Sequence, residues 1–262
     1  MPEQAEITPA IRELAEAIVG ARKTVVLTGA GVSVPSGIPD FRTPETGMWA
    51  NVDPMEVAHI DTFQNDPERF WSFYGERFAS LGDKVPNGAH KALAKLERRG
   101  LIEAVITQNI DRLHHMAGTE DLIEVHGSIE FSDCLDCGAT YELEWVRDRA
   151  AENGIPRCDQ CDAGSPLKPK VVLFGEMLPE QALQRAFELA AAADLIIAVG
   201  SSLVVHPVAG LPSITLRSGG QLALMTNGPT PFDVDAFVKL DGDIEDEFAA
   251  LMAAVDEVLA AG

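Results

Sequence analysis

The sequence predicts an α/β protein: a doubly wound parallel sheet joined to a smaller second domain. Apolar runs of strand length alternate with segments whose apolar residues recur at helical spacing, which is typical of parallel sheets. These runs are apolar throughout, as expected of strands that helices cover on both faces. The alternation is interrupted between residues 131 and 169, where all 4 cysteines lie, so we expect an inserted module there.

The first helix is predicted to begin at Thr8-Pro9, because Thr is a favoured N-cap and Pro suits the first helical position. It should end at Gly20 and pack on the edge of the sheet. Asp243 is expected to cap the last helix, which is amphipathic. The helices predicted between these two cover residues 89–99, 179–193 and 208–217.

Short apolar runs predict the strands of the sheet. They cover residues 24–27, 102–107, 122–125, 171–174, 195–199, 221–225 and 236–240. An aromatic-rich, irregularly helical segment precedes the second of these runs and is typical of a small helical module. We expect a Rossmann-like domain at residues 1–48, 86–130 and 170–262. The smaller domain should combine a helical part at 49–85 with the cysteine module at 131–169.

Acidic residues dominate the charge of the chain. Its 262 residues include 41 Asp and Glu against 20 Lys and Arg, a formal net charge of −21. Such a chain lacks the cations that neutralise phosphates, so neither nucleic acids nor anionic membranes are expected partners. The acidic residues are spread along segments with a folded pattern, which favours an acidic folded surface over a disordered tail.

We hypothesise that this surface suits a high-salt cytoplasm, where screening relaxes the repulsion between like charges. An ordinary acidic protein of a low-salt cell is the alternative. The hypothesis predicts that the free energy of unfolding rises between low and molar potassium chloride, measured by denaturant titration. A stability that salt leaves unchanged would contradict it.

No targeting or membrane segment is expected from the sequence. Residues 1–6 lack a basic start followed by an apolar core, and the longest apolar stretches, such as 195–199, have only strand length. We therefore expect a cytoplasmic protein.

The cysteines form two Cys-x-x-Cys pairs, Cys134 with Cys137 and Cys158 with Cys161. Two such turns can close a tetrahedral thiolate site for structural zinc (Zn²⁺). Disulfides are disfavoured in a cytoplasmic protein. An iron–sulfur centre and two redox pairs are the competing interpretations.

Small residues follow the first strand at Gly29, Ala30 and Gly31. They let the backbone approach a bulky anion such as a nucleotide pyrophosphate, although tight turns that bind nothing have the same composition. Polar turns also follow later strands, at Gln108-Asn109, Ser201-Ser202 and Thr226-Asn227. Ligands of open α/β sheets bind outside the carboxyl ends of the strands, so we expect these loops to meet at one cleft.

The stretch from Thr28 to Arg42 resembles the cofactor-binding loop of the sirtuins, the NAD-dependent protein-lysine deacylases. The resemblance recurs at residues 107–111, 126–128, 174–176 and 200–203 and at the paired cysteines, and so covers nearly the whole chain. It implies NAD as co-substrate, acyl-lysine proteins or peptides as substrates, and structural zinc. The implied reaction transfers the acyl group to ADP-ribose and releases nicotinamide, with acetyl as the default acyl group.

The resemblance also implies the roles of single residues. A histidine at a strand end is more often structural, but His126 is the only histidine followed by glycine and matches the general base of the family. The other histidines are interpreted as structural. Thr226-Asn227 departs from the Asn that the family commonly has at this strand end, which leaves one ribose contact open. The residues implied to contact NAD are Gly29, Ala30, Gly31, Phe41, Arg42, Gln108, Asn109, Ile110, Asp111, Gly200, Ser201, Ser202, Thr226, Asn227 and Ile244.

The implied substrate groove is formed by Val172, Phe174, Gly175 and Glu176, with Val204 opposite. An extended peptide would add there as a strand, whereas the simpler interpretation of residues 171–174 is a core strand. Tyr74 and Arg77 share one helix face and match a pair that, in some sirtuins, binds succinyl and malonyl carboxylates. A surface Arg beside a core Tyr is the alternative.

Two other functions are compatible with the same residues. One is ADP-ribosyl transfer to a protein, which uses the same departure of nicotinamide. The other is a non-catalytic NAD-binding module, against which the complete 109–111 loop and His126 argue. The oligomeric state and the physiological substrates do not follow from the sequence.

Overall fold

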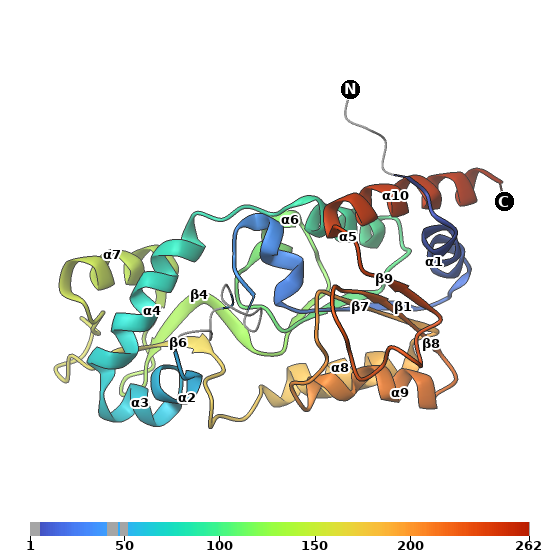
Figure 1. Ribbon diagram of the computed structural model, residues 1–262. Helices are drawn as coiled ribbons and strands as arrows, with labels where there is room; N and C mark the ends of the chain where they lie inside the picture. The colour runs from blue at the N-terminus through green and yellow to red at the C-terminus, as the bar shows by residue number, and fades with distance from the viewer. Residues whose placement is uncertain (1–5, 41–46, 48–51, 262) are drawn as a thin grey trace.

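The computed structural model describes residues 6–40, 47 and 52–261. Figure 1 shows a larger part that contains a parallel sheet between two helical layers and a smaller part at the other end of the molecule. The helices are α1 (Pro9–Gly20), α2 (Pro54–Val57), α3 (Ile60–Asn65), α4 (Pro67–Gly82), α5 (Gly88–Arg98), α6 (Leu113–Ala117), α7 (Leu143–Asn153), α8 (Glu180–Ala192), α9 (Leu211–Arg217) and α10 (Ile244–Ala261). The strands are β1 (Thr24–Thr28), β2 (Ala104–Thr107), β3 (Leu122–Glu124), β4 (Gly127–Cys134), β5 (Thr140–Glu142), β6 (Leu167–Val171), β7 (Leu195–Val199), β8 (Gln221–Met225) and β9 (Val238–Leu240).

The larger sheet has the order β3-β2-β1-β7-β8-β9, and every neighbouring pair is parallel. Helices α1, α5 and α10 cover one face and α8 and α9 the other (Figure 1). Successive residues of β1 enter different cores: Val26 contacts the first helical layer, while Val25 and Leu27 contact the second. The predicted doubly wound α/β fold is confirmed, and burial on both faces explains the uninterrupted apolar runs.

The helix ends agree with the predicted caps. The Thr8 hydroxyl accepts a hydrogen bond from the Ile11 N–H at 3.2 Å, and the Asp243 carboxylate accepts the Glu245 and Asp246 N–H groups at 2.9 and 3.1 Å. Helix α1 packs against α10 and the edge strand β9. No helix among the described residues combines the length and apolar character that a membrane span needs.

The smaller part contains an antiparallel sheet of order β5-β4-β6. Helices α3, α4 and α7 pack with it around a core of aromatic and aliphatic side chains that includes Phe70, Trp71 and Phe78. The sheet begins at Gly127, directly after His126, and ends at Val171. The domain boundaries remain a prediction.

The predicted strand at 171–174 is wrong as a member of the parallel sheet. Strand β6 ends at Val171 and pairs with β4. Beyond it, the Val172 N–H donates to the His126 carbonyl, and Phe174 forms an isolated bridge with the 58–60 segment through two backbone hydrogen bonds. Val171 and Leu173 are buried in the core of the smaller part. An apolar run buried in that core has the same pattern as a central strand, so periodicity alone could not separate them.

Candidate active site

A cavity of about 1330 Å³ opens at the carboxyl ends of the parallel strands. Its walls come from the loops after β1, β2, β7 and β8 and from the segment after β6. The loops expected to meet at one cleft do so. The predicted site residues that line it are Gly29, Ala30, Gly31, Tyr74, Arg77, Gln108, Asn109, Ile110, His126, Val172, Phe174, Gly175, Glu176, Gly200, Ser201, Ser202, Thr226, Asn227 and Ile244.

Other predicted residues lie elsewhere. Asp111 is buried behind the cavity wall, and Val204 is a half-exposed side chain that is not part of the lining. Phe41 and Arg42 lie outside the described residues.

The small residues after β1 and β7 are required by the contact between the two loops. The Gly31 N–H donates to the Gly200 carbonyl at 2.8 Å, and a Cβ on Gly31 would come within 2.7 Å of the Gly200 Cα. Gly200 has a φ of 61°, a conformation that favours glycine. The close approach brings both loops to one side of the cavity.

Ser33 is the centre of a buried hydrogen-bond network behind this wall. Its hydroxyl donates to the Asp111 carboxylate at 2.6 Å and accepts from the Asn109 amide at 3.1 Å. The second Asp111 oxygen accepts the Leu113 N–H at 2.9 Å. Burial raises the pKa of Asp111, although these hydrogen bonds act in the opposite direction. The network holds the 109–111 loop against the first turn.

Two buried histidines adjoin this network, and the sequence analysis did not connect them with the site. His114 Nε2 lies 3.0 Å from the Thr28 hydroxyl, and His90 Nε2 lies 3.5 Å from the Ser33 hydroxyl. Burial lowers the pKa of His90 to about 4 and that of His114 to about 3, so both rings are neutral at pH 7. No sequence pattern could have shown this, because the partners come from different elements.

His126 follows β3 and faces the cavity. Its Nδ1 lies 2.9 Å from the Gln108 carbonyl oxygen, which can only accept, so Nδ1 carries the hydrogen. In the neutral ring the Nε2 atom is therefore the free acceptor. Burial lowers the pKa of His126, while the hydrogen bond to Gln108 raises it in part. A neutral imidazole with one fixed N–H suits a general base.

The four cysteines lie together in the smaller part. All four sulfurs are within 4.8 Å of one another, with contacts of 3.6 to 3.9 Å between Cys134 and Cys161, Cys137 and Cys158, and Cys158 and Cys161. A tetrahedral ion with Zn–S bonds of about 2.3 Å sets its ligands about 3.8 Å apart. These residues thus fit zinc, and because all four positions are filled by protein the ion is structural.

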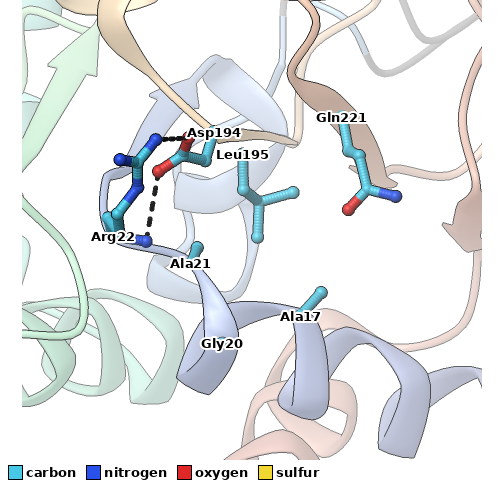
Figure 2. A pocket seen from close by; sticks show the side chains of 7 residues that line it. All are labelled: Ala17, Gly20, Ala21, Arg22, Asp194, Leu195 and Gln221. Carbon is cyan, nitrogen blue, oxygen red and sulfur yellow. Dashed lines mark hydrogen bonds and ion pairs between the residues drawn. The ribbon is translucent and has the colours of Figure 1, made fainter.

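A second, smaller cavity of about 390 Å³ lies at the amino ends of β1, β7 and β8, the opposite edge of the sheet (Figure 2). There the Asp194 carboxylate accepts the Arg22 and Lys23 N–H groups and the Arg22 guanidinium, each at 3.1 Å. These hydrogen bonds connect the residues just before β1 to the residue just before β7. Among the described residues, none of those that line it is a histidine, cysteine or serine, whereas His126 lines the larger cavity, so we place the candidate active site there.

A model described as the Sir2 family matches residues 29–207, which include the cavity-lining loops after β1, β2 and β7, the segment after β6 and the four cysteines. The chain belongs to the Sir2 family, the sirtuins. It is 47% identical over 239 residues to the "NAD-dependent protein deacetylase" of Thermotoga maritima, covering 91% of this chain and 95% of that one. It is 45% identical to the "NAD-dependent protein deacylase 2" of Archaeoglobus fulgidus, covering 88% of this chain and 90% of that one.

Solved structures of the family agree with this fold. A complex of Sir2 with a p53 peptide and NAD⁺ matches with a TM-score of 0.84 and 45% identity, covering 95% of this chain and 99% of that one. Sir2 bound to a propionylated peptide matches with a TM-score of 0.83 and 44% identity, covering 95% and 98% of the two chains.

In this sirtuin, Tyr74 and Arg77 lie on α4 and line the cavity together. The Tyr74 ring stacks on Phe70 with centroids 4.4 Å apart, and the Arg77 guanidinium carbon lies 5.9 Å from the Tyr74 ring centroid. Burial raises the pKa of Tyr74 and lowers that of Arg77. Both side chains line the cavity, so the pair is not a surface feature and the Arg77 guanidinium contributes a positive charge to the lining.

Proposed function

We propose that this protein is an NAD-dependent protein-lysine deacetylase that transfers the acyl group of acyl-lysine to ADP-ribose and releases nicotinamide. The observation that carries the proposal is the position of His126. Its Nε2 atom is a free acceptor in the same cavity that the small-residue loops at 29–31 and 200–202 line. The relatives named deacetylases, and the family complexes with NAD⁺ and acylated peptides, support it.

We assign NAD to the loops at one side of the cavity. Residues 29–31 and 200–202 would receive the phosphates and the adenosine ribose, since both turns offer backbone N–H groups without side-chain bulk. Gln108, Asn109 and Ile110 would bind the nicotinamide ribose and the carboxamide. Asp111 lies behind the cavity wall and would act indirectly: its carboxylate accepts hydrogen bonds from Ser33 and from the Leu113 N–H, which fixes the 109–111 loop. Thr226, Asn227 and Ile244, which also line the cavity, would receive the adenosine end.

When bound, NAD supplies ADP-ribose as the acyl acceptor and nicotinamide as the leaving group. The residues of the chain orient the reacting groups and move one proton. His126 accepts a proton at Nε2 from a ribose hydroxyl, and the Gln108 carbonyl stabilises the resulting imidazolium through Nδ1. Phe41 and Arg42 would shield and contact the co-substrate.

The acyl-lysine peptide is assigned to the segment after β6. The Val172 N–H donates to the His126 carbonyl at 2.8 Å, which sets this segment beside the general base. The exposed apolar side chains of Phe174 and Val204 offer contact surface to an extended peptide. Gly175 and Glu176 complete the wall.

The test is single-turnover product analysis by mass spectrometry, with NAD and acetyl-lysine or succinyl-lysine versions of one peptide. Deacylation yields free lysine, nicotinamide and O-acyl-ADP-ribose in equal amounts. An ADP-ribosylated protein with the acyl-lysine intact would instead establish the transferase alternative. Bound NAD with neither product would support the non-catalytic module.

Acetyl is the default acyl group, and we propose acidic acyl groups as a second class because Arg77 places a positive charge in the cavity lining. Replacing Arg77 with Met should lower kcat/KM for succinyl-lysine by roughly 30-fold or more, because a charge-assisted pair is lost in a largely desolvated site. Activity on acetyl-lysine should change less than threefold or so. Steady-state kinetics on the paired peptides measures this.

The matched control is Arg69→Met on the same helix, where the side chain is exposed and pairs with Glu56. It should leave the ratio of the two activities unchanged. An equal loss on both peptides in Arg77→Met would mean that Arg77 is only structural.

We also propose a cytoplasmic location, since the zinc site requires four reduced thiols. The acidic composition is compatible with a high-salt cytoplasm, which the salt-dependent unfolding experiment tests.

A further inference from the structure

Lys168 occupies an unusual position on β6. Its side chain is only 12% exposed, and its Nζ contacts three acceptors. These are the Val171 carbonyl at 3.0 Å, the Pro169 carbonyl at 3.2 Å and the Glu176 carboxylate at 2.9 Å. A lysine that is largely buried needs such partners to offset its desolvation. Its bonds connect the end of β6 to the cavity wall.

Glu176 transmits this connection to the backbone of the wall. The carboxylate oxygen that pairs with Lys168 also accepts the Leu173 N–H at 2.9 Å, and the Glu176 N–H donates to the Leu173 carbonyl at 3.0 Å. Residues 173–176 are thus closed into one turn by a side chain and a backbone bond. Gly175, at a φ of 86°, leaves no room for a Cβ, which would lie 2.6 Å from His59 Nε2.

Backbone hydrogen bonds connect the same turn to His126 and to the 58–60 segment. The Val172 N–H donates to the His126 carbonyl, while the Phe174 N–H donates to the Ala58 carbonyl at 3.0 Å and its carbonyl accepts the Ile60 N–H at 3.0 Å. A shift of the turn would therefore change the wall that faces an acyl-lysine peptide. No backbone hydrogen bond joins residues 29–40 or 200–206 to residues 172–176.

We propose that Lys168 is a positioning residue for acyl-peptide binding. It acts through Glu176, which it holds against the Leu173 N–H so that the 172–176 segment keeps the shape that receives the peptide. This inference rests on the deacylase function proposed above. It assigns to Lys168 an effect on the peptide and none on NAD, because its contacts all lie on the peptide side of the cavity.

The experiment compares Lys168→Met, Lys168→Arg and Lys170→Met. Lys170 is the matched control: it lies on the same strand and pairs with Asp133 at 3.2 Å, but it is half-exposed and does not contact the wall. Each variant is measured for the KM of acetyl-lysine peptide, the KM of NAD and kcat. Thermal unfolding and zinc content report on folding.

In Lys168→Met the peptide KM should rise about tenfold, the equivalent of one lost charged hydrogen bond, with the NAD KM within about twofold. Lys168→Arg should recover most of the peptide affinity, and Lys170→Met should match the wild type. Equal changes in both KM values, or an equal effect of Lys170→Met, would overturn the proposal.

Glu176→Gln keeps the test decisive if Lys168→Met does not fold. It removes the ion pair but leaves both carbonyl acceptors of Lys168, and should raise the peptide KM selectively as well; a peptide KM equal to that of the wild type would refute the inference. A wild-type protein that binds neither peptide nor NAD in calorimetry would refute the proposed function instead, which separates the two failures.

Discussion

Replacing His126 with Ala is expected to lower kcat for deacetylation by roughly 10²–10⁴-fold, the usual contribution of a positioned general base. The imidazole Nε2 is the free acceptor in the cavity, and no other described histidine combines this exposure with a fixed Nδ1–H. NAD affinity should change less than kcat, since in the described part of the chain His126 touches the NAD-binding loops only through the Gln108 carbonyl, while residues 29–31 and 200–202 lie on other loops. Quantifying O-acetyl-ADP-ribose in single turnovers, with calorimetry for NAD, measures both effects.

The pH profile is a second readout of the same substitution. Burial lowers the folded-state pKa of His126 below the ordinary histidine value, so the neutral ring persists to a lower pH than in a free histidine and activity is lost as the pH falls through that lowered pKa. This acid limb should be absent from the residual activity of His126→Ala.

Two control variants test whether His126 alone is the general base. Burial raises the pKa of Glu124, two residues from His126, to about 7, and Glu124→Gln tests whether this carboxyl contributes to the acid limb. His115 is exposed, and His115→Ala should retain full activity. A His126→Ala enzyme within about tenfold of the wild type would remove His126 as the base.

Removing the zinc should unfold the smaller part of the molecule. Cys134 and Cys158 are buried members of its core, and structural zinc sites contribute about 10 kcal/mol or more of folding free energy. Cys158→Ser, or a strong chelator, should therefore abolish the cooperative thermal transition of this part and all deacylase activity. Differential scanning calorimetry with a colorimetric zinc assay measures the loss.

The loss should reach the active site through the strands. Strand β4 begins directly after His126 and contains Cys134 at its other end, and β6 pairs with β4 and leads into the 172–176 wall. Asp162→Ala, an exposed neighbour of Cys161, is the control and should keep zinc and activity. A metal-free protein that still unfolds cooperatively and deacylates would contradict the structural role.

Several elements could be predicted closely because their signals are local. The Thr8-Pro9 start, the Asp243 cap and the strand at 195–199 all depend on residues within a few positions of one another. The run at 171–174 was misassigned because an apolar segment has the same pattern in either core. What decides its partner is the pairing of β6 with β4, which is a long-range contact.

The sequence by itself determined the doubly wound sheet, the paired cysteines and the loops at the strand ends, since periodicity, spacing and turn composition act over short distances. Only the tertiary structure decided which side chains meet. The contacts are those of Ser33 with Asp111 and His90, of Thr28 with His114, and of Lys168 with Glu176. These contacts depend on sheet register and on the packing of segments far apart in the chain. The physical reason is that a hydrogen bond requires its two heavy atoms to lie about 3 Å apart. Strand order and the paths of the loops set that distance, whereas the spacing of residues along the sequence does not.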